Sequence, residues 1–225
     1  MSQELKAYCI NLDDRKDKWA DTQAAFKGSG ITPKRFSGIR HSEGWRGCGA
    51  SHVAVAREAM RQGLPWVLIV EDDCVLTPDF AERWPAIKEA LAADNWDIFL
   101  GGPTYVQGPV TLRAPLIEID RGFALHFYVL KACAYEKALA WNPDRHGPID
   151  VYYSNQYRKV TTYPFLASQR PSLSDIKEKT VDYSDEFNSA NDAMIQALYS
   201  LRTRESTIVL VAASLLILWL MRRAS

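Results

Sequence analysis

The sequence predicts an α/β fold with a mostly parallel sheet and helices on both faces of that sheet. Short apolar runs alternate with amphipathic stretches of helical length along residues 7–166. The run at residues 66–70 (WVLIV) is continuously apolar, which is typical of a central strand buried on both faces. The chain of 225 residues has room for one ordinary domain and a short additional segment.

The strands and helices follow from this alternation. We expect a hairpin over residues 110–120 and six further strands, at residues 7–12, 34–36, 66–70, 97–100, 124–130 and 161–166. Helices are expected after Asp13 or Asp14 up to Gly28, from Ser51 to about Gln62, from Thr77-Pro78, over 131–141, and from Pro148. Residues 184–203 fit an amphipathic helix, used as a linker over 184–205.

Composition excludes several classes of protein. The 27 Lys and Arg residues balance 27 Asp and Glu residues, so no basic field attracts nucleic acid, and no nucleic-acid partner is expected. The four cysteines are far apart and form no C-x-x-C pair, which argues against a zinc ribbon and favours free thiols. Nothing in the sequence sets the oligomeric state.

The C-terminal segment departs from this average composition. Residues 207–221 carry no charge, and arginines stand on both sides of them. We expect residues 206–223 to form a hydrophobic helix that anchors the protein to a membrane, and a buried core helix is the alternative. The first residues contain no apolar signal-peptide core, so the body at residues 1–183 is expected in the cytosol.

Three adjacent carboxylates, Glu71, Asp72 and Asp73, directly follow the buried apolar run. Ligands of open α/β sheets bind at the carboxyl ends of the strands. A divalent cation such as Mn²⁺ or Mg²⁺ would relieve the repulsion among carboxylates there, because hard cations prefer oxygen ligands. The alternative is a cluster of capping carboxylates in a loop, with Asp73 capping a turn.

Seven segments, in order, resemble glycosyltransferase family 25, the family of lipopolysaccharide and collagen galactosyltransferases. They cover about residues 7–176: YCINLDDRKDKW from Tyr8, GCGASH from Gly47, LIVEDD from Leu68, NWDI from Asn95, HFYV from His126, PID from Pro148 and SLSDI from Ser172. The resemblance implies a GT-A fold and transfer of a hexose, often galactose from UDP-galactose, to a hydroxyl of a glycan or protein, with Mn²⁺.

The resemblance also implies roles for individual residues. Glu71, Asp73 and His126 are candidate metal ligands, although a core histidine is the alternative for His126. The candidate residues for binding the nucleotide-sugar donor are Asn11, Asp13, Arg15, Ser51, His52 and Asp72. Ser51 and His52 are expected to begin a helix, where Ser51 could simply be an N-cap, and Arg15 could be a surface charge.

Asp150 is the candidate general base. Transfer that inverts the anomeric centre in one step needs a group that takes the proton of the acceptor hydroxyl. Asp150 follows Pro148-Ile149 at an expected helix start, so an N-cap is its alternative role. Two other functions compete with the transferase: a metal-dependent phosphohydrolase, and a non-catalytic membrane scaffold that binds a sugar nucleotide.

Overall fold

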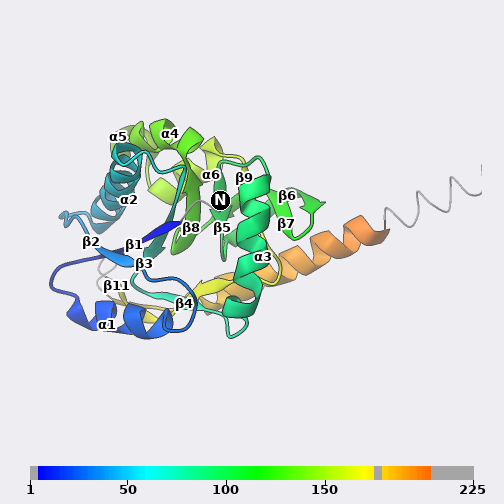
Figure 1. Ribbon diagram of the computed structural model, residues 1–225, viewed down its shortest axis with the longest axis horizontal. Helices are drawn as coiled ribbons and strands as arrows, with labels where there is room; N and C mark the ends of the chain where they lie inside the picture. Colours follow the sequence, from blue (N-terminus) through cyan, green and yellow to red (C-terminus); the bar gives the residue numbers. More distant parts are fainter. Residues whose placement is uncertain (1–4, 175–178, 204–225) are drawn as a thin grey trace, which may run out of the picture.

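The computed structural model describes residues 5–174 and 179–203 and shows an eight-stranded sheet with helices packed on it (Figure 1). The order of the strands across the sheet is β2-β1-β3-β8-β5-β9-β7-β6. Their bounds are β1 Lys6–Asn11, β2 Lys34–Ser37, β3 Trp66–Glu71, β5 Ile98–Leu100, β6 Thr104–Arg113, β7 Leu116–Phe123, β8 Phe127–Lys131 and β9 Lys159–Thr161. Two small sheets pair β4 (Cys74–Leu76) with β10 (Ala167–Gln169), and β11 (Ser172–Ser174) with β12 (Lys179–Val181).

The helices are α1 (Lys16–Ala25), α2 (Gly44–Arg61), α3 (Phe80–Ala93), α4 (Tyr135–Leu139), α5 (Pro143–His146) and α6 (Ile149–Gln156). A short 3₁₀ helix, Ala132–Ala134, precedes α4. A further helix runs through residues 184–203.

The sheet is mixed, with most strands running in one direction. β1 is parallel to β2 and β3, and β5 is parallel to β9. β8 lies antiparallel between β3 and β5, and β7 is antiparallel to both β9 and β6. Six strands therefore run in one direction and two run in the opposite direction, which confirms the α/β class. The sheet also contains antiparallel pairs at its centre and at one edge.

Both faces of the sheet are covered, as the apolar run at 66–70 predicts. Val67 and Ile69 of β3 belong to one buried cluster, which contains Val55 and Ala59 of α2. The alternate residues of the same strand, including Leu68, belong to a second cluster that α3 covers. Because the side-chain period of a strand is two, this division places one cluster on each face.

Several expected boundaries were wrong, and two of them bear on the site or the sheet. α2 begins at Gly44, seven residues before Ser51, so Ser51 and His52 lie inside the helix and do not start it. Ser51 Oγ donates to Gly47 O at 2.7 Å, one turn back, and accepts from Ile39 N at 2.7 Å. The strand expected at 161–166 ends at Thr161, and Pro164 a little further on has no N–H to offer a ladder.

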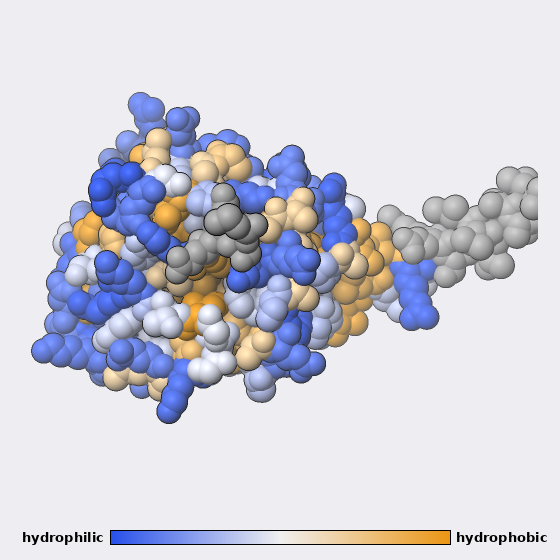
Figure 2. All heavy atoms as spheres, viewed as in Figure 1, coloured by the Kyte–Doolittle hydropathy of each residue, from blue (hydrophilic) through white to orange (hydrophobic). Residues whose placement is uncertain are grey.

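The helix at 184–203 has the expected amphipathic pattern. Phe187, Ala190 and Met194 are buried against the body, whereas Ile195 and Tyr199 are exposed. The helix extends away from the sheet (Figure 1), and Figure 2 shows apolar side chains gathered where it leaves the body. The hydrophobic helix expected at 206–223 lies outside the described residues. Among the helices that are described, none has the length and apolarity needed to cross a bilayer.

Candidate functional site

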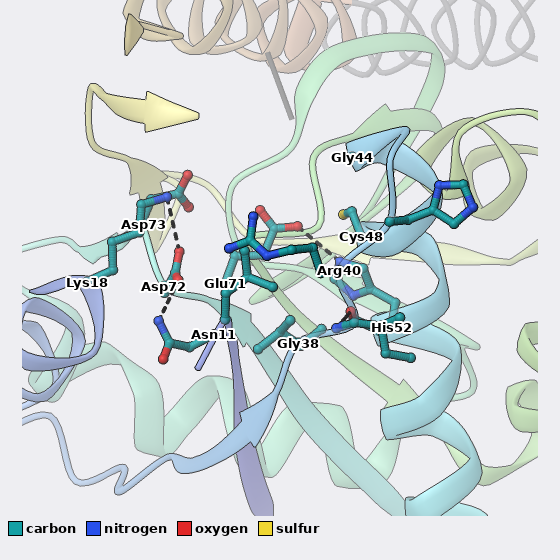
Figure 3. Close-up of a pocket in the computed structure, with 15 residues that line it drawn as sticks. Asn11, Lys18, Gly38, Arg40, Gly44, Cys48, His52, Glu71, Asp72 and Asp73 are labelled. Carbon is teal, nitrogen blue, oxygen red and sulfur yellow. Dashed lines mark hydrogen bonds and ion pairs between the residues drawn. The ribbon is translucent and has the colours of Figure 1, made fainter. Parts of the chain in front are cut away.

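A cavity opens at the carboxyl ends of β1 and β3, the two parallel strands that end at Asn11 and Glu71 (Figure 3). The Glu71–Asp73 segment lines it, together with α2 and the loop at residues 38–41. The position agrees with the general rule that ligands of open α/β sheets bind at the carboxyl ends of strands. The sheet therefore brings the acidic cluster to a place where a ligand can reach it.

Glu71 points toward α2. Its Oε1 lies 3.0 Å from His52 Nε2, and the other ring nitrogen of His52 lies 3.0 Å from Tyr128 Oη. His52 is fully buried. Burial alone would raise the pKa of Glu71, but the hydrogen bond with His52 holds that pKa below its ordinary value. Glu71 is therefore held as an anion beside a fixed imidazole.

Asp72 points away from Glu71, toward α1. It accepts a hydrogen bond of 2.7 Å from Asn11 Nδ2 and lies 3.4 Å from Lys18 Nζ. Burial raises its pKa, while Lys18 and Asn11 oppose that rise. Two of the candidate donor-binding residues, Asn11 and Asp72, are thus in direct contact, with a lysine that the sequence reasoning missed.

Asp73 lies beside Glu71 and shares a donor with it. Gln169 Nε2 is 3.3 Å from Asp73 Oδ2 and 3.4 Å from Glu71 Oε2. Burial, followed by the charges of Glu71 and Asp72, raises the pKa of Asp73 to about 7. A bound cation would remove this penalty, so the oxygen donors of Glu71 and Asp73 fit the hard cation that the sequence suggested.

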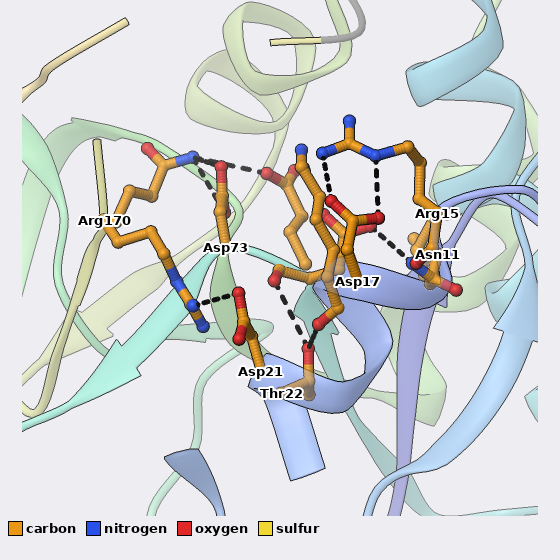
Figure 4. A network of polar contacts seen from close by, with 12 residues as sticks. Asn11, Arg15, Asp17, Asp21, Thr22, Asp73 and Arg170 are labelled. Atoms are coloured by element: carbon orange, nitrogen blue, oxygen red, sulfur yellow. Dashed lines mark hydrogen bonds and ion pairs between the residues drawn. The ribbon is translucent and has the colours of Figure 1, made fainter. Parts of the chain in front are cut away.

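Strand β10 fixes Gln169 over the acidic cluster. Arg170 N donates to Asp73 O at 2.9 Å, and the Arg170 guanidinium lies 2.6 Å from Asp21 of α1 (Figure 4). These contacts tie β10 to the segment after β3 and to α1. No local sequence pattern links Gln169 to carboxylates nearly one hundred positions earlier, so the sequence reasoning missed it.

Two candidate donor-binding residues lie outside the cavity lining. Asp13 is exposed and accepts from Arg35 Nη2 at 2.6 Å and Ser37 Oγ at 2.8 Å. Arg15 pairs with Asp17 at 2.9 Å (Figure 4). Arg40 does line the cavity, where its guanidinium lies 2.8 Å from Asp14. Arg40 and Lys18 are the cations of this lining, and neither belonged to the predicted set.

Asp150 lines a second hollow that shares Cys48, His52 and Glu71 with the first. It sits in the first turn of α6, where its Oδ1 accepts from Val151 N at 2.8 Å, and Pro148 holds the N-cap position. Burial is the main cause of its raised pKa. The candidate base thus lines a cavity that adjoins that of the acidic cluster, with Glu71 lining both, and the N-cap alternative for Asp150 does not hold.

His126 is placed in the core. Its side chain is fully buried, and its ring centroid lies 5.3 Å from that of Phe187 in an edge-to-face arrangement. Burial lowers its pKa to about 4. His126 belongs to neither cavity lining, although its backbone oxygen accepts from Glu71 N at 3.0 Å.

Cys48 is a further residue that the sequence reasoning left out. It lies one helical turn before His52 and faces Glu71, as Figure 3 shows. One ligand atom from each of Cys48, His52 and Glu71 lies within 4.8 Å of the others. Sequence reasoning could not pair Cys48 with His52, because it placed the start of the helix at Ser51. Since α2 starts at Gly44, Cys48 and His52 are an i, i+4 pair on one helix.

Comparison with known proteins finds a distant relative. The chain matches no family model. It is 26% identical over 151 residues to the human protein "Inactive glycosyltransferase 25 family member 3", which covers 62% of this chain. The chain spans only a quarter, 25%, of that relative's length. The similarity agrees with the resemblance seen in the sequence segments.

Several solved structures are similar to this chain, with low TM-scores and low sequence identity. A197 from STIV has a TM-score of 0.47 at 15% identity, covering 79% of this chain and 93% of its own. A glycosyltransferase involved in glycosylation of the major capsid of PBCV-1 has a TM-score of 0.43 at 12% identity, with 72% and 71% covered. A UDP-glucose pyrophosphorylase complexed with UDP-glucose has a TM-score of 0.44 at 10% identity, with 84% and 79% covered.

Proposed function

We propose that this chain is a metal-assisted glycosyltransferase that moves a hexose from a nucleotide-diphosphate sugar to a hydroxyl of a glycan or protein. The observation that carries the proposal is a pair of adjoining cavities that share Glu71. The first is lined by Glu71, Asp72 and Asp73, and the second by Glu71 and Asp150. The distant similarity to a protein named as a family 25 member supports the same reading. Galactose as the sugar, and inversion at the anomeric carbon, are parts of the proposal.

The residues of the first cavity suit a nucleotide diphosphate. Asn11, held by Arg35 and Asp72, presents a fixed amide at the end of β1. Lys18 and Arg40 offer positive charge to phosphate oxygens. Glu71 and Asp73 would hold Mn²⁺, with Mg²⁺ as the alternative cation. When bound, the cation neutralises charge on the departing diphosphate.

Asp150 is proposed as the general base. Its carboxylate is half-buried, and its raised pKa makes it a better proton acceptor than an ordinary surface aspartate. The proton of the acceptor hydroxyl would pass to a carboxylate oxygen of Asp150 as that hydroxyl attacks the sugar. His52 and Tyr128 hold Glu71 in place during this step.

Calorimetric titration of UDP-galactose into the full chain tests the donor assignment. We expect binding that strengthens with Mn²⁺ and that weakens about tenfold or more in Arg40→Gln, because that variant removes a cation from the lining. Arg57→Gln, at an exposed position on α2, is the matched control and should bind as the parent does. Absence of donor binding with Mn²⁺ would refute the assignment.

A non-catalytic sugar-nucleotide binder is the second candidate, because the human relative's name describes it as inactive. The two candidates differ in turnover. The transferase consumes UDP-galactose when acceptor hydroxyls are supplied, and Asp150→Asn removes that activity while donor binding remains. Binding without turnover over a panel of acceptors would favour the scaffold. Release of phosphate from the donor would favour the phosphohydrolase.

A further inference from the structure

Cys48, His52 and Glu71 converge on one point between α2 and the end of β3. Their ligand atoms lie within 4.8 Å of one another, and His52 Nε2 is 3.0 Å from Glu71 Oε1. Ligands that surround one small metal ion stand roughly 3–4 Å apart, because each bond is about 2.0–2.3 Å long. The three side chains therefore already hold nearly the spacing that a shared ion requires.

We propose that Cys48, His52 and Glu71 form a binding site for a soft or borderline transition metal such as Zn²⁺, which adjoins the hard-cation position at Asp73 and shares Glu71 with it. The inference concerns binding of the metal alone and does not depend on the transferase proposal. Cys48, His52 and Glu71 all line the hollow that Asp150 also lines. A ligand or water in that hollow would be able to reach an ion held by the three side chains.

The donor set decides which metal fits. Thiolate sulfur and imidazole nitrogen select Zn²⁺, Co²⁺ or Cu over Mg²⁺ and Mn²⁺, which prefer oxygen ligands. Three protein ligands with one open position are the arrangement of zinc sites that meet a substrate. Glu71 and Asp73, by contrast, offer only oxygen.

The surroundings of His52 orient its ring for this role. Tyr128 Oη lies 3.0 Å from Nδ1, so the ring cannot rotate without losing that contact. In the metal-free protein Nε2–H donates to the Glu71 carboxylate and Nδ1 accepts from Tyr128 Oη. A metal ion that takes the place of the Nε2 proton would leave Nδ1–H to donate to Tyr128. His52 is fully buried, so packing also fixes its ring. Such support of a ligating imidazole by a second hydrogen bond is usual in metal sites.

The negative charges near Cys48 and the partial exposure of its side chain also favour binding of a cation. Cys48 is only half-buried and lines both cavities, so an ion can reach it. The carboxylates of Glu71, Asp73 and Asp150 line the same cavities as Cys48. A cation at this point would offset those negative charges, and its binding would displace the thiol proton.

Titration of Co²⁺ into the metal-stripped full chain tests the proposal, because a thiolate bound to Co²⁺ gives a charge-transfer absorption band that oxygen ligands do not give. We expect one Co²⁺ per chain with this band, and its loss on addition of one equivalent of Zn²⁺. Cys48→Ser should abolish the band and weaken Zn²⁺ binding about 100-fold or more. Cys133→Ser, which changes an exposed cysteine, should leave both unchanged.

Glu71→Gln and His52→Gln provide further arms with readouts other than activity. Each should weaken Co²⁺ binding while the thiolate band, where binding persists, changes in position. Circular dichroism confirms that each variant folds. A band that survives in Cys48→Ser, displacement of Co²⁺ by an equal concentration of Mn²⁺, or absence of stoichiometric Co²⁺ binding by the folded parent would overturn the proposal.

Discussion

Asp73 carries the sharpest conflict between charge and burial at the site. Its carboxylate is packed beside Glu71 and Asp72, and burial, followed by the charges of these neighbours, raises its pKa to about 7. Asp73→Asn removes this repulsion and also removes a proposed ligand of Mn²⁺. We therefore expect the melting temperature at pH 8 to stay the same or rise, while turnover falls about 100-fold or more.

Differential scanning fluorimetry and a transfer assay on the same samples check this prediction. Asp192→Asn, an exposed change on the helix at 184–203, is the control and should alter neither quantity. Near-parental turnover in Asp73→Asn would show that Asp73 does not bind the cation. A large loss of stability would show instead that its carboxylate is needed by the fold.

His126 makes a prediction about pH because it is buried without charge. Its pKa is lowered to about 4 in the folded protein, whereas an unfolded histidine titrates near 6.5. Between these values the unfolded chain binds the proton and the folded protein does not. The contribution of uncharged His126 to the free energy of unfolding is therefore complete above about pH 6.5. It falls by up to about 1.4 kcal/mol per pH unit as the pH drops toward 4.

Urea unfolding at several pH values measures this effect. His126→Gln should flatten the dependence of the free energy of unfolding on pH across this window. His41→Gln, at an exposed position, should keep the parental slope. An unchanged slope in His126→Gln would mean that the folded protein protonates His126 as readily as the unfolded chain does.

At the scale of elements, α2 depends on the loop at residues 38–41. Ser51 is buried and bridges the two: its hydroxyl donates to Gly47 O and accepts from Ile39 N, both at 2.7 Å. Ser51→Ala leaves the Ile39 N–H without that partner, which costs about 1–3 kcal/mol of stability. The loop also lines the cavity, so we expect weaker donor binding as well.

Chemical denaturation and donor titration together test the role of Ser51. Thr203→Ala removes a hydroxyl that donates to helix carbonyls far from the cavity, so it is the comparison variant. If Ser51→Ala lowers stability no more than Thr203→Ala does, the bridge to the loop is not what the hydroxyl contributes. Loss of stability with intact donor affinity would separate the loop from the donor site.

The same helix shows why one boundary could not be predicted. The segment that opens α2 contains Gly44, Gly47 and Gly49, and its sequence is typical of a loop. In the structure, an added Cβ at Gly47 would overlap Ile39 O, and one at Gly49 would overlap the Trp141 ring. Close packing between distant segments therefore fixes the helix start, and no local pattern carries that information.

Local pattern did predict the elements that packing does not override. The apolar run of β3 and the carboxylates after it were found from sequence because their signal is continuous. Asn11 and Asp72 were each expected at a strand end as donor-binding residues, but the hydrogen bond between them was not predicted. Gln169 and Cys48 were missed, since β10 reaches the site through a long-range antiparallel pairing with β4 and Cys48 precedes the helix start that was expected.

For the whole molecule, the chain divides into a part that holds the site and a part that does not. The two cavities are lined by residues up to Glu186. The helix at 184–203 contributes Phe187, Ala190 and Met194 to the buried core. The uncharged run at 207–221 lies outside the described residues, and its membrane role remains a prediction from the sequence.

Two truncations distinguish the roles of these segments. Ending the chain at Glu205 keeps the core contacts of the 184–203 helix, so we expect unchanged donor affinity and melting temperature. Ending it at Tyr183 removes Phe187 and Met194 and exposes the part of the core that these side chains cover. Truncating one buried Phe or Met side chain typically costs about 2–5 kcal/mol, so this second form should be strongly destabilised. Both effects are read by thermal denaturation with and without UDP-galactose.

Cell fractionation of the same two forms beside the full chain tests the membrane role. Each aliphatic side chain near the middle of a bilayer gains roughly 0.3–0.6 kcal/mol, so residues 207–221 together favour insertion. The full chain should sediment with membranes and resist extraction by salt, whereas the form ending at Glu205 should not sediment. If the full chain stays out of the membrane fraction, or if removal of residues 206–225 unfolds the body, the segment packs against the domain as a core helix.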